Sequence, residues 1–152
     1  MRYSERVEPH VDKRTRDATA YFTIFWSPVV PMTKRVIHGR VPSLPGIFEV
    51  YVDEGGRTPV LLGRSRAYYG GLRNTCRGLI DTTSPYPLNG TPLDLTRPHF
   101  VRYAVLPSSD DMDDILFFFA ARSGMEDEVD DSGRYEMIYV KEERLRADGR
   151  RR

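Results

Sequence analysis

In an extended run over residues 47–52, Ile47, Glu49 and Tyr51 lie on one side and Phe48, Val50 and Val52 on the other. A short polar stretch, Asp-Glu-Gly-Gly, follows this run, and a second apolar run covers residues 58–63. A period of two is typical of a β-strand with one buried face. The two glycines between the runs can take positive φ, as tight reversals require. The pattern therefore predicts a β-hairpin over residues 46–63, with Pro59 at an edge or entry position of its second strand.

Further strands are predicted on either side of this hairpin. Residues 19–26 are rich in aromatic and β-branched side chains, and residues 99–106 form another mostly apolar run that can alternate its side chains between two faces. Both patterns are typical of strands. We expect 99–106 to join the hairpin in one antiparallel sheet. A last strand is predicted over 134–140, with a frayed, charged helix after it.

Two helices are predicted from apolar residues that recur at helical spacing. The first follows the hairpin and places its arginines on a different face from its apolar residues. The second covers residues 107–124. Ser108 or Ser109 can cap it, acidic residues fill its first turn, and Gly124 follows its end.

Together these elements predict an α+β fold, with a small three-stranded antiparallel sheet flanked by helices and extra segments at both termini. Residues 1–17 show no clear apolar period and are predicted to be a charged arm or a frayed helix. Residues 18–140 are predicted to form one domain, because the chain has 152 residues. Residues 141–152 are predicted to be a charged tail.

The composition is that of a globular protein. Charged residues make up 30% of the chain and hydrophobic residues 39%, and no apolar run reaches the roughly 18 residues that span a membrane. The N-terminus lacks the apolar centre of a secretory signal. Cys76 is the only cysteine, which excludes an internal disulfide framework. We therefore expect a cytoplasmic protein that has no membrane partner.

Charge is unevenly placed, although the net charge is only +1. No acidic residue lies within 64–77. A local basic face can hold phosphates even when the total charge is near zero, because the screening length is about 8 Å at physiological salt. This segment is a candidate nucleic-acid-binding surface, and a solvated helix face is the alternative. Its four arginines are Arg64, Arg66, Arg73 and Arg77.

Aspartates cluster at the start of the second predicted helix. They occupy positions 110, 111, 113 and 114. Carboxylates in a first helical turn interact favourably with the helix dipole, which accounts for three of the four without any function. A metal-binding role is the other interpretation.

The hairpin also carries two short motifs. Gly46-Ile47-Phe48 lies on the first strand, and Leu61-Leu62-Gly63 follows on the second after twelve intervening residues. With Arg73 in the next helix, this stretch resembles the GIY-YIG nuclease family, whose small domain packs a three-stranded antiparallel sheet between helices. The resemblance covers residues 44–120. Asp113 stands where that family keeps a metal-binding glutamate.

The resemblance implies phosphodiester hydrolysis with Mg²⁺ or Mn²⁺. In that family two motif tyrosines serve the water and the phosphate, an arginine steadies the negative charge, and a carboxylate holds the metal. Arg73 would then be catalytic. Phe48 and Leu61 replace the two tyrosines, so Tyr68 and Tyr69 become the candidates for the lost hydroxyls. Alternatively, Tyr68 packs inward and Tyr69 is a surface aromatic residue.

The sequence therefore predicts a nucleic-acid-binding module with reduced or lost hydrolysis, and DNA is favoured over RNA as its partner. One alternative is an active divalent-metal-dependent endonuclease with rearranged hydroxyls. The other is an α+β protein-interaction domain with no nucleic-acid role. We expect Phe48 and Leu61 to lie across from each other near Arg73 as a small apolar floor. The oligomeric state is left open.

Overall fold

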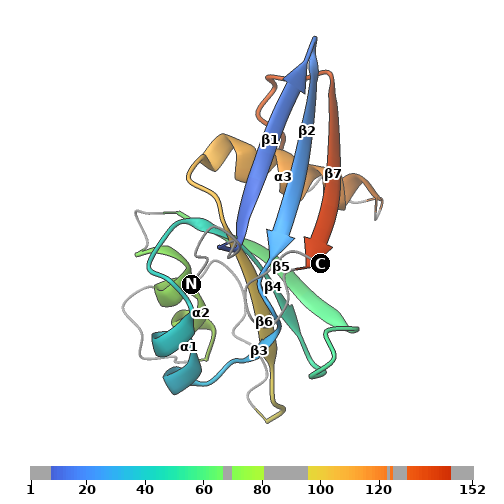
Figure 1. Ribbon diagram of the computed structural model, residues 1–152. Helices are drawn as coiled ribbons and strands as arrows, with labels where there is room; N and C mark the ends of the chain where they lie inside the picture. The colour runs from blue at the N-terminus through green and yellow to red at the C-terminus, as the bar shows by residue number, and fades with distance from the viewer. Residues whose placement is uncertain (1–7, 67–69, 81–95, 123, 125–129, 145–152) are drawn as a thin grey trace, which may run out of the picture. The chain divides into compact units, whose positions relative to one another are not determined.

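The computed structural model describes residues 8–66, 70–80, 96–122, 124 and 130–144 (Figure 1). The described residues form seven strands and three helices, divided between two compact units. Unit 1 comprises Met1–Pro28 and Ser108–Arg152, and unit 2 comprises Val29–Pro107. In the sequence, unit 2 is therefore inserted between the two halves of unit 1.

The sheet of unit 1 joins segments from both ends of the chain. β1 (His10–Arg16) and β2 (Thr19–Trp26) form an antiparallel hairpin, and β7 (Met137–Arg144) runs parallel to β2. The predicted strand over 19–26 is thus confirmed. Side chains alternate along β2, so that one face is solvated and the other is buried. Ala20, Phe22, Ile24 and Trp26 are buried on one face, and Phe25, near the end of the strand, is buried on the other.

The helix of unit 1, α3 (Ser109–Arg122), packs against β7 and lies behind the sheet in Figure 1. Its first turn is capped by Ser108, whose Oγ accepts a hydrogen bond from the backbone N–H of Asp111 at 3.2 Å. Gly124, at φ +72°, follows its end. The helix predicted over 107–124, its serine cap and its terminal glycine are confirmed.

Unit 2 is built on four strands in the order β5-β4-β6-β3. β4 (Gly46–Tyr51) lies between β5 (Pro59–Ser65) and β6 (Phe100–Val105) and is antiparallel to both. The short β3 (Val30–Pro31) pairs with β6. The predicted hairpin, and the predicted pairing of 99–106 with it, are therefore confirmed.

Two helices, α1 (Lys34–Arg40) and α2 (Gly71–Ile80), pack on one face of this sheet. Complete burial of an aliphatic or aromatic side chain stabilises a fold by about 1.5–3 kcal/mol. The cluster between the helices and the sheet is therefore the main support of unit 2. Its buried members include Ile37, Phe48, Val50, Leu72, Cys76 and Val101.

Cys76 gives this core a chemical test. Burial raises the pKa of its thiol to about 12, from the ordinary value of 9.0. Only the thiolate is reactive, so Cys76 should not react with Ellman's reagent in the native protein at about pH 8 and should react in denaturant. The unfolded thiol ionises first as the pH rises, so the free energy of unfolding should fall above about pH 9. Urea titrations should therefore show that the wild type loses stability above about pH 9 and that Cys76→Ala does not lose this contribution. A difference in the free energy of unfolding between the two proteins that stays constant with pH would contradict the prediction.

The predicted sheet was wrong. The described residues form seven strands rather than a small three-stranded sheet, and unit 2 alone has four. Residues 10–16, predicted as an arm or a frayed helix, form β1. Residues 141–144, predicted as part of a charged tail, complete β7. Both segments are rich in charged side chains and have little apolar alternation of their own. They become strands because β2 supplies backbone partners on both of its edges.

Candidate functional site

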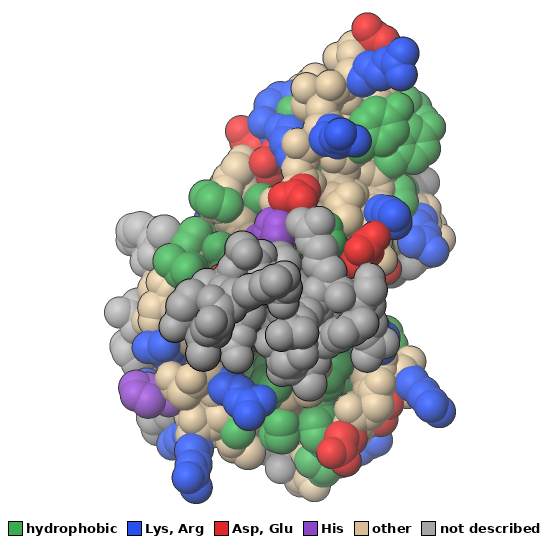
Figure 2. All heavy atoms as spheres, in the orientation of Figure 1, with side chains coloured by type: hydrophobic (Ala, Val, Ile, Leu, Met, Phe, Trp, Pro, Cys, Tyr) green, Lys and Arg blue, Asp and Glu red, His purple; other side chains and the backbone are tan. Residues whose placement is uncertain are grey.

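The helix α1 carries exposed basic side chains. Thr33 caps it, because its Oγ1 accepts a hydrogen bond from the backbone N–H of Val36 at 3.2 Å. Ile37 is the buried residue of this helix. In Figure 2, Lys and Arg side chains gather over the region of α1. Its exposed basic residues are Lys34, Arg35, His38 and Arg40.

Hydrogen bonds join the start of α2 to the segment that follows α1. The backbone N–H groups of Leu72 and Arg73 donate to the carbonyls of Leu44 and Pro42, at 2.8 and 3.0 Å. The Nε of Arg73 donates to the carbonyl of Val41 at 2.9 Å. These amides of α2 are thus used within the chain and do not bind an anion in the way an open helix terminus can. The Arg73 guanidinium is held beside the end of α1.

Gly71 permits this close approach. Its φ is +79°, in the left-handed region. A Cβ at this position would lie 2.6 Å from the backbone of both Ser43 and Leu44. Only glycine fits both the space and the backbone conformation.

The contact brings together two segments that contain no acidic residue, 27–48 and 55–80, which hold eight Lys and Arg residues. Unit 2 as a whole has ten Lys and Arg residues and five Asp and Glu residues, which gives a net charge of +5. Unit 1 has thirteen Lys and Arg residues and seventeen Asp and Glu residues, which gives a net charge of −4. We call the basic residues of α1 and α2 the basic face. They are Lys34, Arg35, His38, Arg40, Arg73 and Arg77.

Two of the acidic residues in unit 2 have partners of their own. Glu49 on β4 accepts a hydrogen bond from Nη2 of Arg102 at 2.7 Å and another from the hydroxyl of Tyr51. Asp53 accepts hydrogen bonds from backbone N–H groups across the hairpin turn. The hydrogen bond from Arg57 lowers the pKa of Asp53 below its ordinary value. Both carboxylates are therefore engaged on the sheet and its turn.

The predicted helix with Arg66, Arg73 and Arg77 on one of its faces was wrong in its geometry. α2 begins at Gly71, so Arg73 and Arg77 lie on it, four residues apart and half-buried. Arg64 lies on β5 and Arg66 follows that strand. The two glycines at 70 and 71 delay the helix, and the pattern of apolar residues alone did not show this. Tyr68 and Tyr69 lie outside the described residues.

The predicted placement of Phe48 directly across from Leu61 was also wrong. The hairpin register pairs Phe48 with Gly63 and Val50 with Leu61. The Phe48 ring lies over Gly63, where a Cβ would come within 2.6 Å of it. Phe48 belongs to the core, and Leu61 packs against the same core. Core packing therefore explains the apolar residues at both positions.

Asp113 lies on α3 in unit 1, whereas Arg73 lies in unit 2. Across the described ranges, no three His, Cys, Asp or Glu side chains come together in a way that could hold a metal ion. The Mg²⁺ or Mn²⁺ site predicted at Asp113 therefore has no ligand set in this part of the chain.

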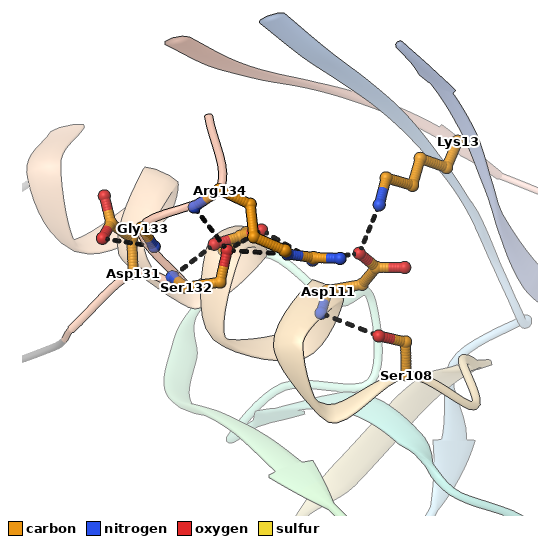
Figure 3. A network of polar contacts seen from close by, with 8 residues as sticks. Lys13, Ser108, Asp111, Asp131, Ser132, Gly133 and Arg134 are labelled. Carbon is orange, nitrogen blue, oxygen red and sulfur yellow. Dashed lines mark hydrogen bonds and ion pairs between the residues drawn. The ribbon is translucent and has the colours of Figure 1, made fainter. Parts of the chain in front are cut away.

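Two of the neighbouring aspartates instead form an ion-pair network in which the carboxylates are buried and the cations are partly exposed (Figure 3). Asp114 is fully buried and accepts hydrogen bonds from the backbone N–H and the hydroxyl of Ser132, at 2.7 and 2.9 Å. Nη2 of Arg134 lies 2.6 Å from Oδ1 of Asp111 and 3.1 Å from Oδ2 of Asp114. Nζ of Lys13 lies 2.8 Å from Oδ1 of Asp111. The network joins β1, α3 and the segment that leads into β7.

Both cations of this network are stabilised in their charged form. Burial works against the charge of Lys13, but hydrogen bonds to Asp111 and Tyr135 outweigh it and raise the pKa of the ammonium above its ordinary value. Burial likewise opposes the charge of Arg134, and hydrogen bonds to Asp111 and Asp114 raise its pKa. The network is balanced and internally satisfied, so we assign it an architectural role.

Sequence reasoning did not single out Arg134, Lys13 or Ser132. Asp111 and Asp114 were interpreted mainly through the helix dipole, but the structure gives them a further role as the anions of the network. Their spacing of three residues, which places both on one side of a helix, was the available signal. The cations come from segments far away in the sequence, and their arrival at α3 is a tertiary event.

A family model described as "Uncharacterised protein" matches residues 10–148, from the first residue of β1 to beyond the end of β7. The chain belongs to this family. No curated protein and no solved structure matches the chain. The resemblance to the GIY-YIG nuclease family was therefore wrong. It depended on a β-hairpin followed by a helix with an arginine, an arrangement that unrelated folds can share.

Proposed function

We propose that unit 2 binds nucleic acid through the basic face. The observation that carries the proposal is the junction at α2. There, Arg73 and two backbone hydrogen bonds connect two acid-free segments. The phosphates of a nucleic acid are closely spaced, so cations on two packed helices can meet several phosphates of one strand at once.

The residue types suit this ligand. An arginine guanidinium is planar and donates paired hydrogen bonds to phosphate oxygens. The Nε of Arg73 donates to the carbonyl of Val41. A guanidinium has four further N–H donors, on its two Nη atoms. Phosphates are common to DNA and RNA, and the expected preference for DNA depended on the nuclease resemblance. The proposal therefore covers both polymers.

The described residues include no helix that is long and apolar enough to span a bilayer. A cytoplasmic setting is part of the proposal, supported by a lone thiol that is buried and unpaired with another cysteine. We do not propose the endonuclease alternative, because it depended on the nuclease resemblance.

Removing two charges from the basic face should weaken binding in a salt-dependent manner. We expect Arg35→Gln with Arg40→Gln to reduce the slope of log affinity against log salt by about 1.8, because each lost phosphate contact on a duplex is worth about 0.9. Fluorescence anisotropy of a labelled duplex over a salt series measures the slope. Arg57→Gln with Arg97→Gln is the matched control, since it removes the same charge from exposed positions of unit 2 outside the basic face.

Equal slopes for the two double variants would place the binding surface elsewhere. Competition by polyglutamate as strong as competition by DNA of equal charge would favour the protein-interaction alternative, in which an acidic polypeptide is the partner. Absence of any duplex or single-strand binding at low salt would remove the proposed function.

A further inference from the structure

The solvated face of the unit 1 sheet presents a row of three side chains across three strands. The β1–β2 register pairs Arg14 with Tyr21, and the β2–β7 register pairs Tyr21 with Tyr139. Directly paired residues point to the same face of a sheet. The adjacent row contains Arg16, Thr19 and Met137.

The two tyrosines are unusually open for aromatic side chains. Tyr21 is 43% exposed, Tyr139 48% and the neighbouring Met137 51%. The tyrosine rings stack on each other with centroids 5.5 Å apart and an interplanar angle of 15°. Figure 2 shows a patch of exposed apolar and aromatic side chains over β2 and β7, with Lys and Arg side chains beside it.

The charges around the rings favour an anion. Arg14 and Arg16 are exposed, and within the described part of the chain their guanidinium groups form no ion pair. Lys141 also lies on this face, where it pairs with Glu143 at 3.1 Å. Asp12, the acid of β1, bonds His10 at 3.1 Å. The cations nearest the tyrosines along β1 are thus available to a ligand.

We infer that this face is a stacking platform for the exposed bases of single-stranded nucleic acid. Aromatic side chains beside cations bind such strands because every base has a π-face and every linkage has a phosphate. A duplex hides its base faces and cannot use the platform. Among the described strands, β7 pairs with β2 alone and lies at the edge of the sheet. A base can therefore stack on the face of the Tyr139 ring that is opposite Tyr21. The inference rests on the proposed function for the class of ligand but uses a different surface.

A second copy of the chain is the competing occupant. Exposed aromatic side chains next to a free strand edge can also form a dimer by edge pairing. Arg14 and Arg16 favour the nucleic acid, because a two-fold dimer through this face would bring the same two cations of each copy towards each other. The two occupants can be distinguished by experiment, because only binding of a nucleic acid to the tyrosines depends on the presence of bases.

The test compares a labelled oligothymidylate of about ten nucleotides with an abasic strand of the same length and charge, a size within the range of single-strand sites. Tyr21→Thr with Tyr139→Thr removes the rings and keeps residues that favour strands. Tyr21→Phe with Tyr139→Phe keeps the rings. We expect the wild type and the Phe variant to bind oligothymidylate about tenfold more tightly than the Thr variant does. The abasic strand should bind all three alike. Circular dichroism and thermal melting of each variant verify the fold, and sedimentation gives the oligomeric state.

Each outcome is decisive for one of the two surfaces. Equal binding of both strands by the wild type, or equal oligothymidylate binding by the Thr variant and the wild type, overturns the platform. A dimer that the Thr substitutions dissociate without changing oligothymidylate binding also overturns it and assigns the face to a second copy. The Arg35→Gln, Arg40→Gln variant separates the proposals. A reduced salt slope without base dependence supports the basic face alone, whereas base dependence with an unchanged slope supports the platform alone.

Discussion

Replacing Asp114 with alanine is expected to lower the free energy of unfolding by about 3 kcal/mol. The substitution leaves the backbone N–H and the hydroxyl of Ser132 without their acceptor, and it removes one of the two carboxylates that Arg134 bridges. We expect a loss at the lower end of the range of about 3–5 kcal/mol for breaking a buried ion pair. Arg134 retains Asp111 and is 36% exposed, so water compensates part of its loss.

Urea titration of the full chain measures the change, and two variants assign it. Asp114→Asn keeps an acceptor for Ser132 and removes the charge, so its loss should be intermediate. Asp110→Ala removes an exposed acid from the first turn of the same helix. It should lose about 0.3–1 kcal/mol, the contribution of an acid at a helix N-terminus. Equal losses for Asp110→Ala and Asp114→Ala would refute the network as a source of stability.

Gly71→Ala is expected to lower the free energy of unfolding by about 2–4 kcal/mol, because it combines a strained backbone conformation with a steric overlap. The residue has φ +79°, and its new Cβ would meet the backbone of Ser43 and Leu44 at 2.6 Å. The overlap is with backbone atoms, so no side chain can rotate to relieve it. The start of α2 would have to move away from the segment that follows α1.

Gly39→Ala is the matched control. Gly39 lies within α1, and nothing lies within 4 Å of the position that its Cβ would take. Alanine in a helix is favoured over glycine by about 0.5–1 kcal/mol, so this variant should be slightly more stable than the wild type. Thermal melts of the two variants give opposite shifts if the close approach at Gly71 is as described. A Gly71→Ala protein as stable as the wild type would show that the helix start tolerates displacement.

Local patterns predicted those elements whose own residues determine them. The β4–β5 hairpin has two short apolar runs around a glycine turn, and α3 has a capping serine, acids in its first turn and a terminal glycine. For these elements the sequence-based prediction was correct. β1 differs, because Asp12, Lys13, Arg14 and Arg16 leave it few apolar positions. Its strand conformation depends on β2, and no local pattern contains that information.

The candidate site was predicted only in part, for the same reason. The absence of acids near Arg73 was visible in the sequence, but the partner surface on α1 depends on hydrogen bonds to Pro42 and Leu44. The exposed tyrosine pair was not predicted at all, because Tyr21 and Tyr139 are 118 residues apart and meet only through the parallel pairing of β2 with β7. A run rich in aromatic residues indicates a strand, but it does not show which rings remain exposed.

The insertion of unit 2 between β2 and α3 determines the order in which the chain can complete its structure during synthesis. Once Pro107 has left the ribosome, all the residues of unit 2 are present. β2 lacks its parallel partner until Met137–Arg144 has been made. A nascent chain that stalls before β7 therefore presents an unpaired β2 edge, which can pair with other nascent chains or recruit a chaperone. Premature termination between α3 and β7 would thus yield a polypeptide with unit 2 present and an aggregation-prone remnant of unit 1.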